Sequence, residues 1–153
     1  MSRRPLRHEA RFEEAAQAQS LADSIHALVA SVRARAGPQV VFIYLLPEET
    51  DVPEDVEIAA CRMCEMAVGN ALRRHDAHRL TIELSLRHER LVVRVADDGE
   101  GFDATQTSGL RERVSLDVMQ ACVHEAGGRF DVRSAPGAGT CISGLFPLDA
   151  TLK

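Results

Sequence analysis

Two short stretches of alternating apolar and polar residues that run into an acidic turn constrain the fold of this chain most. In 79–87 and 91–97 apolar residues recur at every second position, which predicts two half-buried β-strands, joined as a hairpin by His88 and Glu89. The second strand ends in Asp97-Asp-Gly-Glu-Gly-Phe-Asp103, where carboxylates meet glycines that let a backbone bend tightly and approach a ligand. Acidic turns after strands are also common without any function, so this turn alone assigns none.

The periodicity of the remaining chain predicts an α+β fold. Apolar residues recur at helical spacing in three segments, which we expect to be helices over 8–35, 54–74 and 111–126. Further strands are expected over 39–46, 129–134 and 140–147. This order predicts a two-layer α/β sandwich, with helices on one face of a mixed, largely antiparallel sheet. We assign residues 20–150 to this domain and residues 1–19 to an N-terminal helical extension.

Apolar patterns also predict which faces are buried. The run from Val40 to Leu46 is continuously apolar, so the strand over 39–46 is expected to be buried on both faces. In the helix over 111–126 one face carries the apolar set that we expect to be buried. That set is Val114, Val118, Cys122 and Ala126.

Composition and charge exclude several classes of function. A formal charge of −5 and 4% aromatic residues argue against nucleic acid binding through phosphate contacts or base stacking. The longest apolar run is too short to span a bilayer, and the N-terminus lacks the apolar segment of a signal peptide, so we expect a cytoplasmic chain without membrane contact. Cys61 and Cys64 lie in a helical pattern without a second close pair, which favours apolar packing over metal or redox chemistry.

Asn70 is the polar residue that stands out in the helix over 54–74. Asparagine is a poor residue inside a helix, and burying its amide without a partner costs about 1–3 kcal/mol. One interpretation is an asparagine that faces solvent near the helix end. The other is an amide aimed into a cleft, where its oxygen ligates a hard cation such as Mg²⁺.

Three segments, in order, resemble the ATP-binding domain of two-component sensor histidine kinases. Residues 57–74 (EIAACRMCEMAVGNALRR) are similar to the asparagine box of the nitrate-sensor and desaturase-sensor type. Residues 97–103 (DDGEGFD) resemble the first glycine box, and 125–140 (EAGGRFDVRSAPGAGT) resemble the closing glycine-rich segment. With the entry helix, the resemblance covers about residues 20–148.

The resemblance implies the Bergerat ATP-binding fold of histidine kinases, gyrase B, Hsp90 and MutL, with ATP and Mg²⁺ bound. It implies that Asn70 ligates Mg²⁺, that Arg73 contacts phosphate and that Asp97 accepts the adenine amino group. Other residues that it implies line the base, belong to the lid or lie near the adenine are Gly99 and Gly101, Gly109 and Leu110, and Thr140. These roles agree with elementary chemistry, because an exocyclic amine needs a fixed acceptor and Mg²⁺ prefers oxygen ligands.

Two departures from the family pattern concern catalysis. Four residues before the asparagine the family usually has an acidic or polar residue, taken as the catalytic base, and here this residue is Met66. Glu65 is then either a weak candidate for the base or a solvated surface residue, because five residues before Asn70 lie about 140° around a helix. The lid is reduced to 108–110, with 115–116 as a candidate second Gly-Leu, which leaves fewer backbone N–H groups to bind phosphate.

The leading hypothesis is a histidine-kinase ATP-binding domain that presents Mg-ATP to a histidine on another segment or chain. Its expected partners are a phosphoacceptor histidine domain or a response regulator, and a homodimer through the N-terminal helix is a further expectation. The alternative is a degenerate, non-catalytic member of the fold that docks a sigma factor, a kinase or a response regulator. A third hypothesis is an α+β domain with accidental motifs. The sequence leaves open whether the domain is enzymatically active.

Overall fold

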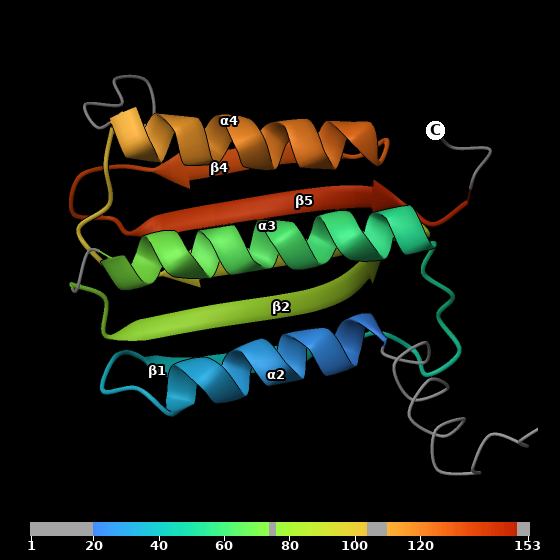
Figure 1. The fold of residues 1–153 in the computed structure, drawn as a ribbon, viewed down its shortest axis with the longest axis horizontal. Coiled ribbons are helices and arrows are strands. Elements are labelled where there is room, and N and C mark those ends of the chain that lie inside the picture. Colours follow the sequence, from blue (N-terminus) through green and yellow to red (C-terminus); the bar gives the residue numbers. More distant parts are fainter. Residues whose placement is uncertain (1–19, 74–75, 104–109, 150–153) are drawn as a thin grey trace, which may run out of the picture.

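The computed structural model describes residues 20–73, 76–103 and 110–149, which form two layers (Figure 1). Three helices lie side by side on one face of a sheet. The helices are α2 (Leu21–Arg33), α3 (Glu54–Arg73) and α4 (Leu110–Glu125). The strands are β1 (Gln39–Tyr44), β2 (Arg79–Arg87), β3 (Arg90–Asp97), β4 (Arg129–Ser134) and β5 (Thr140–Pro147).

The sheet confirms the predicted α+β architecture. Its five strands have the order β1-β2-β3-β5-β4. β1 pairs with β2 in parallel, and the pairs β2–β3, β3–β5 and β4–β5 are antiparallel. The two hairpins are local, whereas the parallel pair requires α3 as a crossover, as parallel neighbours generally do.

Local sequence explains where the elements begin and turn. Ser20 caps α2, because its hydroxyl accepts the N–H of Asp23 at 3.2 Å and the Asp23 carboxylate accepts the N–H of Ser20 in return. Between β2 and β3, His88 and Glu89 have φ values of 49° and 60°, as the tightest hairpin turns require. The part of the predicted first helix before residue 20, and with it the 1–19 extension, lies outside the described residues.

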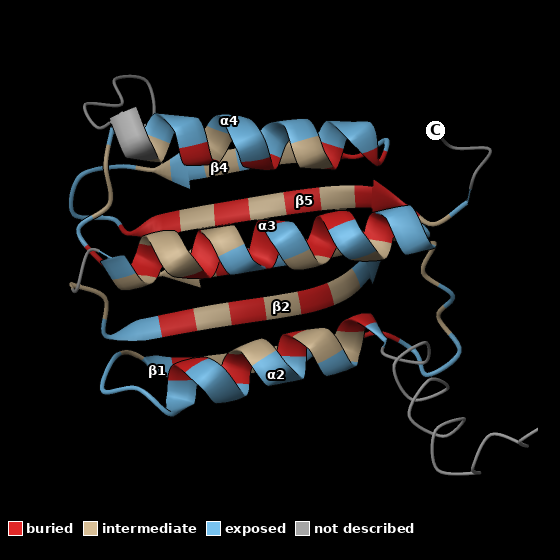
Figure 2. Cartoon of the chain, viewed as in Figure 1, coloured by how far each residue is buried: buried red, intermediate tan, exposed pale blue. Residues whose placement is uncertain are grey.

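The core lies between the helices and the sheet. Buried residues alternate along β2 and β5 and line the inner sides of α2 and α3 (Figure 2). Fully buried side chains on the sheet include Leu80, Ile82, Leu84, Leu91, Val93 and Phe146. The opposite face of the sheet has no helix of the described chain over it, so the alternation predicted from the sequence separates a helix-covered face from an open face.

Two expectations about burial are wrong. β1 is an edge strand and only its Val40 is buried, while Tyr44 is 41% exposed and Leu45, which follows the strand, is 61% exposed. Of the set expected to be buried at α4, Val114 and Val118 are 51% and 43% exposed and Cys122 is half-buried, while Ala126 is buried as predicted. The residues of α4 and its end that are buried are Ser115, Met119, Val123 and Ala126. α4 thus has two apolar stripes, and the stripe that contains Met119 and Val123 is the one that packs against the rest of the domain.

Candidate functional site

The predicted ligand-binding residues meet where α3 and β3 end and β5 begins, beside α4. A cavity there lies between the helices and the sheet, and its lining includes Asn70, Asp97 and Thr140. The other lining residues are Ala67, Ala71, Val95, Phe102, Glu112, Leu116 and Ile142. Residues 70, 97 and 140 are far apart in the sequence, and α3, β3 and β5 bring them together.

Three side chains hold the acidic turn that follows β3. The Asp97 carboxylate Oδ1 accepts the N–H of Gly99 at 2.9 Å, and the Asp76 Oδ2 accepts the N–H of Glu100 at 2.7 Å. The Ser134 hydroxyl accepts the N–H of Phe102 at 2.8 Å. Because each N–H has its own side-chain acceptor, the turn is fixed in shape before any ligand arrives.

Asp98 has a different task from its neighbour Asp97. Its Oδ1 accepts the backbone N–H groups of His78 and Arg79, each at 2.8 Å, and so fastens the turn to the start of β2. The N–H of Arg79 first, and that of His78, lower the pKa of the Asp98 carboxyl, because they stabilise its ionised form. Asp98 is exposed and does not line the cavity.

The turn between β4 and β5 packs tightly against the acidic turn. Gly139 has φ +71°, and a Cβ placed on it would lie 2.2 Å from the carbonyl oxygen of Asp97. Gly101 has φ +67°, and a Cβ there would lie 2.3 Å from the carbonyl oxygen of Ala135. The N–H of Gly137 donates to the carbonyl of Glu100 at 2.6 Å. Gly101 and Gly139 therefore allow the two turns to pack in direct contact. This packing, and not only the approach of a ligand, requires glycine at both positions.

Ser134 connects this second turn to Thr140. The Ser134 hydroxyl donates to the carbonyl of Gly139 at 3.0 Å and lies 2.9 Å from the Thr140 hydroxyl. Thr140 is 8% exposed and pairs with Asp97 across β3 and β5. The cavity floor is therefore a continuous network from the acidic turn to β5.

Asn70 is engaged by α4. Its Nδ2 donates to the Ser115 hydroxyl at 3.0 Å, and that hydroxyl lies 3.2 Å from the Asn70 Oδ1. Ser115 is 8% exposed and stands inside α4, five residues after the helix begins. The contact argues against the solvent-facing interpretation of Asn70, because its side chain points into the interface of α3 and α4. Its role as a cation ligand stays a prediction.

The cavity is closed in this structure. Its volume is about 10 Å³, which is room for about one water molecule. Phe102, Glu112 and Leu116 line it beside the three predicted residues. The chemistry of the set fits a nucleotide with Mg²⁺, since it offers one amide oxygen, one carboxylate and one hydroxyl, but the space does not admit a nucleotide without a movement of these side chains or of α4.

The other predicted site residues do not line this cavity. Arg73 and Glu65 are exposed on α3, and Met66 is half-buried against the core. Gly99 and Gly101 shape the turn beside it. Leu110 begins α4, without a described side chain, and Gly109 lies outside the described residues.

Residues that the sequence analysis did not assign complete the site. Asp76 and Ser134 hold the turn, while Ser115 engages Asn70. Ser134 lies in the quoted closing segment and Ser115 at the candidate second Gly-Leu, so position in the family motifs was a usable signal for both. Asp76 follows the asparagine box without any motif, and no pattern in the sequence points to it.

Metal and membrane features are limited in the described chain. Within 20–73, 76–103 and 110–149, no group of three or more His, Cys, Asp and Glu side chains is arranged to hold a metal ion. Cys64 is fully buried, which raises the pKa of its thiol, and Cys61 is half-buried, so the prediction of apolar packing for this pair is confirmed. No described helix combines the length and apolar character needed to cross a membrane.

Known proteins with similar sequences are ATPases and sensor proteins. The family model described as histidine kinase-, DNA gyrase B-, and HSP90-like ATPase matches residues 55–150. The sensor protein VraS of Staphylococcus saprophyticus is 32% identical over 130 residues, and that of Staphylococcus aureus strain COL is 28% identical. The match covers 85% of this chain and 36% of each relative, so the chain spans about a third of their length.

Solved structures share the fold. The histidine kinase domain of a blue-light activated histidine kinase from Erythrobacter litoralis superposes with a TM-score of 0.65 at 20% identity, covering 84% of this chain and 61% of that one. The histidine kinase AdeS of Acinetobacter baumannii gives 0.63 at 12% identity, covering 85% and 66%. At these identities the likeness shows the fold and nothing more.

Proposed function

Because the chain belongs to the family of histidine kinase-, DNA gyrase B-, and HSP90-like ATPases, we propose that it binds Mg-ATP in the cavity between α3, α4 and the sheet. It is an ATP-binding catalytic domain of the two-component histidine kinase type. Its substrate in this proposal is a histidine on another segment or chain, with a response regulator downstream. The nitrate-sensor or desaturase-sensor subtype, and a homodimer through the N-terminal segment, stay predictions.

One observation carries the proposal: Asn70, Asp97 and Thr140 line the same cavity. The N–H of Gly99 donates to the Asp97 carboxylate and helps to fix its position. In this proposal the Asp97 carboxylate, an acceptor-only group when ionised, accepts the adenine amino group. Thr140 would lie beside the base, on the strand that pairs with Asp97.

The metal would be held mainly by the nucleotide. Asn70 supplies one protein oxygen, and Mg²⁺ generally takes its other ligands from phosphates and water. When bound, Mg-ATP supplies the γ-phosphoryl group, and catalysis of its transfer is mostly positioning and charge stabilisation. Asn70 has to give up its contact with Ser115 to serve as a ligand, and Arg73, exposed at the end of α3, is the proposed phosphate contact.

A non-catalytic binding module is the second candidate function, and specific observations favour it. Met66 occupies the position of the usual base, and Glu65 is exposed and outside the cavity lining. α4 is already helical at Ser115 and Leu116, the candidate second Gly-Leu, so the N–H groups of these two residues are used inside the helix, and only those of its first turn lack intrahelical partners. Such a chain would bind nucleotide weakly or only when a partner opens the site.

An ATP titration with a matched pair of variants tests nucleotide binding. We expect wild type to bind ATP more tightly with Mg²⁺ than without it, and Asp97→Asn to lose at least roughly tenfold in affinity, because an amide is a weaker acceptor than a carboxylate. Glu89→Gln changes the charge equally in the exposed β2–β3 turn, away from the cavity, and should leave affinity unchanged. Wild type that fails to bind ATP would exclude the proposal, and equal losses in both variants would exclude the adenine assignment.

Phosphotransfer to a supplied histidine domain separates the two candidate functions. A wild type that transfers phosphate supports the kinase, and loss of that transfer in Glu65→Gln would identify Glu65 as the base. A silent wild type with a gain in Met66→Glu would indicate a catalytic domain that has lost its base. Silence in both, with ATP binding intact, would favour the binding module.

A further inference from the structure

The face of the sheet that no described helix covers has an unusual charge. Side chains on this open sheet face alternate with the buried ones along each strand. Its charged residues are Arg79, Glu83 and Arg87 of β2, Arg90 and Arg94 of β3, and Arg129, Asp131 and Arg133 of β4. The open sheet face thus carries six arginines and two carboxylates, although the formal charge of the whole chain is −5.

The strand register arranges these charges in rows. Arg87 lies directly opposite Arg90, and Glu83 lies opposite Arg94, which in turn faces Ser143 and then Asp131 on the next strands. Both carboxylates are therefore in one row, and the other rows carry only positive charge. The centre of the face is formed by small or branched, half-buried residues, which are Val92, Ala96, Cys141, Ser143 and Leu145.

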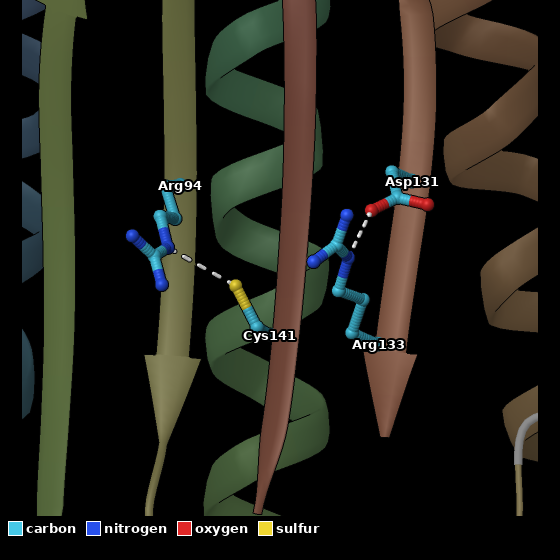
Figure 3. A network of polar contacts seen from close by, with 4 residues as sticks. All are labelled: Arg94, Asp131, Arg133 and Cys141. Carbon is cyan, nitrogen blue, oxygen red and sulfur yellow. Dashed lines mark hydrogen bonds and ion pairs between the residues drawn. The ribbon is translucent and has the colours of Figure 1, made fainter.

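Few of the arginines have an acidic partner. Among the described residues the one ion pair on this face joins Arg133 Nε to Asp131 Oδ2 at 3.2 Å, and Arg94 Nε donates to the Cys141 thiol at 3.1 Å (Figure 3). No acidic partner within the described chain pairs with Arg87, Arg90 or Arg129. Like charges directly opposite one another destabilise a strand pair. The Arg87–Arg90 pair therefore destabilises the β2–β3 hairpin, and no described carboxylate forms an ion pair with either residue.

We propose that the open sheet face docks an acidic polypeptide segment of a partner protein. A depression of about 580 Å³ between Arg94, Arg133 and the β4–β5 turn provides a concave part of this surface, and at its end nearest the proposed nucleotide site its lining also includes Asp97 and Thr140. Arg94 and Arg133 lie two strands apart and two positions out of register, so their backbones are about 12 Å apart. Carboxylates seven residues apart on one face of a helix are separated by about 11 Å, which is close to this spacing.

The same features disfavour other polyanions. No aromatic side chain of the described strands lies on this face, so nothing can stack on the bases of a single strand. A nucleic acid or lipid surface is uniformly negative and would meet both Glu83 and Asp131 in the central row. A protein partner can place neutral or basic side chains opposite those two residues, which is how charge patterns give specificity.

Three arginines at the end of the face away from Asp97 provide the test. We expect Arg87→Glu/Arg90→Glu/Arg129→Glu to weaken binding of a labelled Glu- and Asp-rich peptide by at least roughly tenfold in fluorescence anisotropy. The matched control reverses three exposed arginines elsewhere, Arg35, Arg62 and Arg113, with the same change in net charge. The control should keep wild-type affinity, and raising the salt from about 0.05 M to about 0.2 M should weaken wild-type binding.

Other outcomes would overturn the proposal. Absence of peptide binding to wild type, or equal loss in the control, would show that no specific surface exists. Tighter binding of a DNA duplex or of phosphatidylserine vesicles than of the peptide would assign the face to another partner. If the Glu variant does not fold, as judged by circular dichroism, the corresponding Gln variant should still weaken peptide binding. Because these arginines lie away from the cavity, ATP affinity should not change, and failure here leaves the proposed nucleotide site unaffected.

Discussion

At the scale of single residues, the site is built from interlocked turns. The glycines of the motif allow the carbonyl of Asp97 and the backbone at Gly139 to touch. The two neighbouring aspartates then divide the work, with Asp97 at the cavity and Asp98 at the start of β2. A motif that looks like one functional unit in sequence thus separates into residues that face a ligand and residues that hold the backbone.

Two glycines of the β4–β5 turn allow the effect of this contact to be measured. Gly137 and Gly139 both have positive φ, but a Cβ on Gly137 would meet nothing within 4 Å, whereas one on Gly139 would meet the carbonyl of Asp97. We expect Gly137→Ala to lower the free energy of unfolding by about 1 kcal/mol, the cost of a left-handed conformation. Gly139→Ala should lower it by about 3 kcal/mol or more, because a steric overlap adds to that cost.

Urea unfolding of the two variants measures the difference. Of the two variants, only Gly139→Ala should also lose ATP binding, because only Gly139 lies against Asp97. Equal unfolding free energies would mean that the turns separate readily, and the interlocked geometry would then not be needed for stability.

Asp98 should make stability depend on pH. The pKa of its carboxyl is lowered in the folded state, so its charge stabilises the fold above its ordinary unfolded pKa of about 3.9 and loses this effect as pH falls through the folded pKa. Asp98→Asn keeps an acceptor oxygen but not the charge. We expect it to be less stable than wild type at pH 7 and equally stable at the acid end of the titration.

Urea titrations at several pH values check this, with Asp98→Ala as a second variant. Removing the acceptor should cost roughly 1 kcal/mol even at low pH, because two backbone N–H groups lose their partner. A difference between wild type and Asp98→Asn that is constant with pH would contradict the assignment.

At the scale of elements, the hairpins were predictable and the orientation of α4 was not. The strands over 79–87 and 129–134, and their partners, follow from a period of two and short turns, which are local properties. The burial of α4 depends on α3, because Val114 and Val118 form a helical stripe as plausible as Met119 and Val123. Contact with Asn70 and the α3 surface decides between them, and no window of local sequence contains that information.

The candidate site was likewise predictable only in part. Asn70, Asp97 and Thr140 followed from the resemblance to a family, and they do line one cavity. Asp76 was not predictable, because its role depends on an acceptor geometry between segments 24 residues apart. The open sheet face was predictable in part: alternation puts the arginines of each strand on the side away from the described helices, but the pairing of β3 with β5, which brings the arginines of the two hairpins onto one surface, is not a local property.

Two valines of α4 test the corrected orientation of this helix. Val123 is fully buried and Val118 is 43% exposed. We expect Val123→Ala to cost about 2 kcal/mol of unfolding free energy, from lost burial and a small cavity. Val118→Ala should change it by less than about 0.5 kcal/mol, and a reversed order in urea unfolding would restore the face expected from the sequence.

Ser115 on α4 should compete with the metal for Asn70. Ser115→Ala removes the hydroxyl that occupies both atoms of the amide. Since a typical hydrogen bond is worth about 1 kcal/mol, we expect Mg-ATP to bind about fivefold more tightly to the variant. ATP without Mg²⁺ should bind equally to both proteins, and weaker Mg-ATP binding by the variant would instead make Ser115 part of the ligand site.

At the scale of the whole molecule, the site lies where α4 meets α3 and the sheet. The cavity of about 10 Å³ brings Asn70, Asp97 and Thr140 together but has no room for a nucleotide in this structure. Where binding needs a movement of α4, the apparent affinity for nucleotide equals the affinity of the open form multiplied by the fraction of molecules that are open. A partner that moves α4 would raise this fraction without contacting the nucleotide.

Amide hydrogen exchange on addition of Mg-ATP tests this division of the molecule. We expect altered protection in α4, in 97–102 and in 134–140, because these segments line the cavity or hold its turns. The amides of β1 and of the β2–β3 hairpin turn lie away from the cavity and should keep their protection factors. Asp97→Asn is the control, which should show a much smaller change in these segments at an ATP concentration near the wild-type Kd. If β1 changed as much as α4, opening would involve the entire domain, and the cavity could not be described as a local gate between one helix and a fixed sheet.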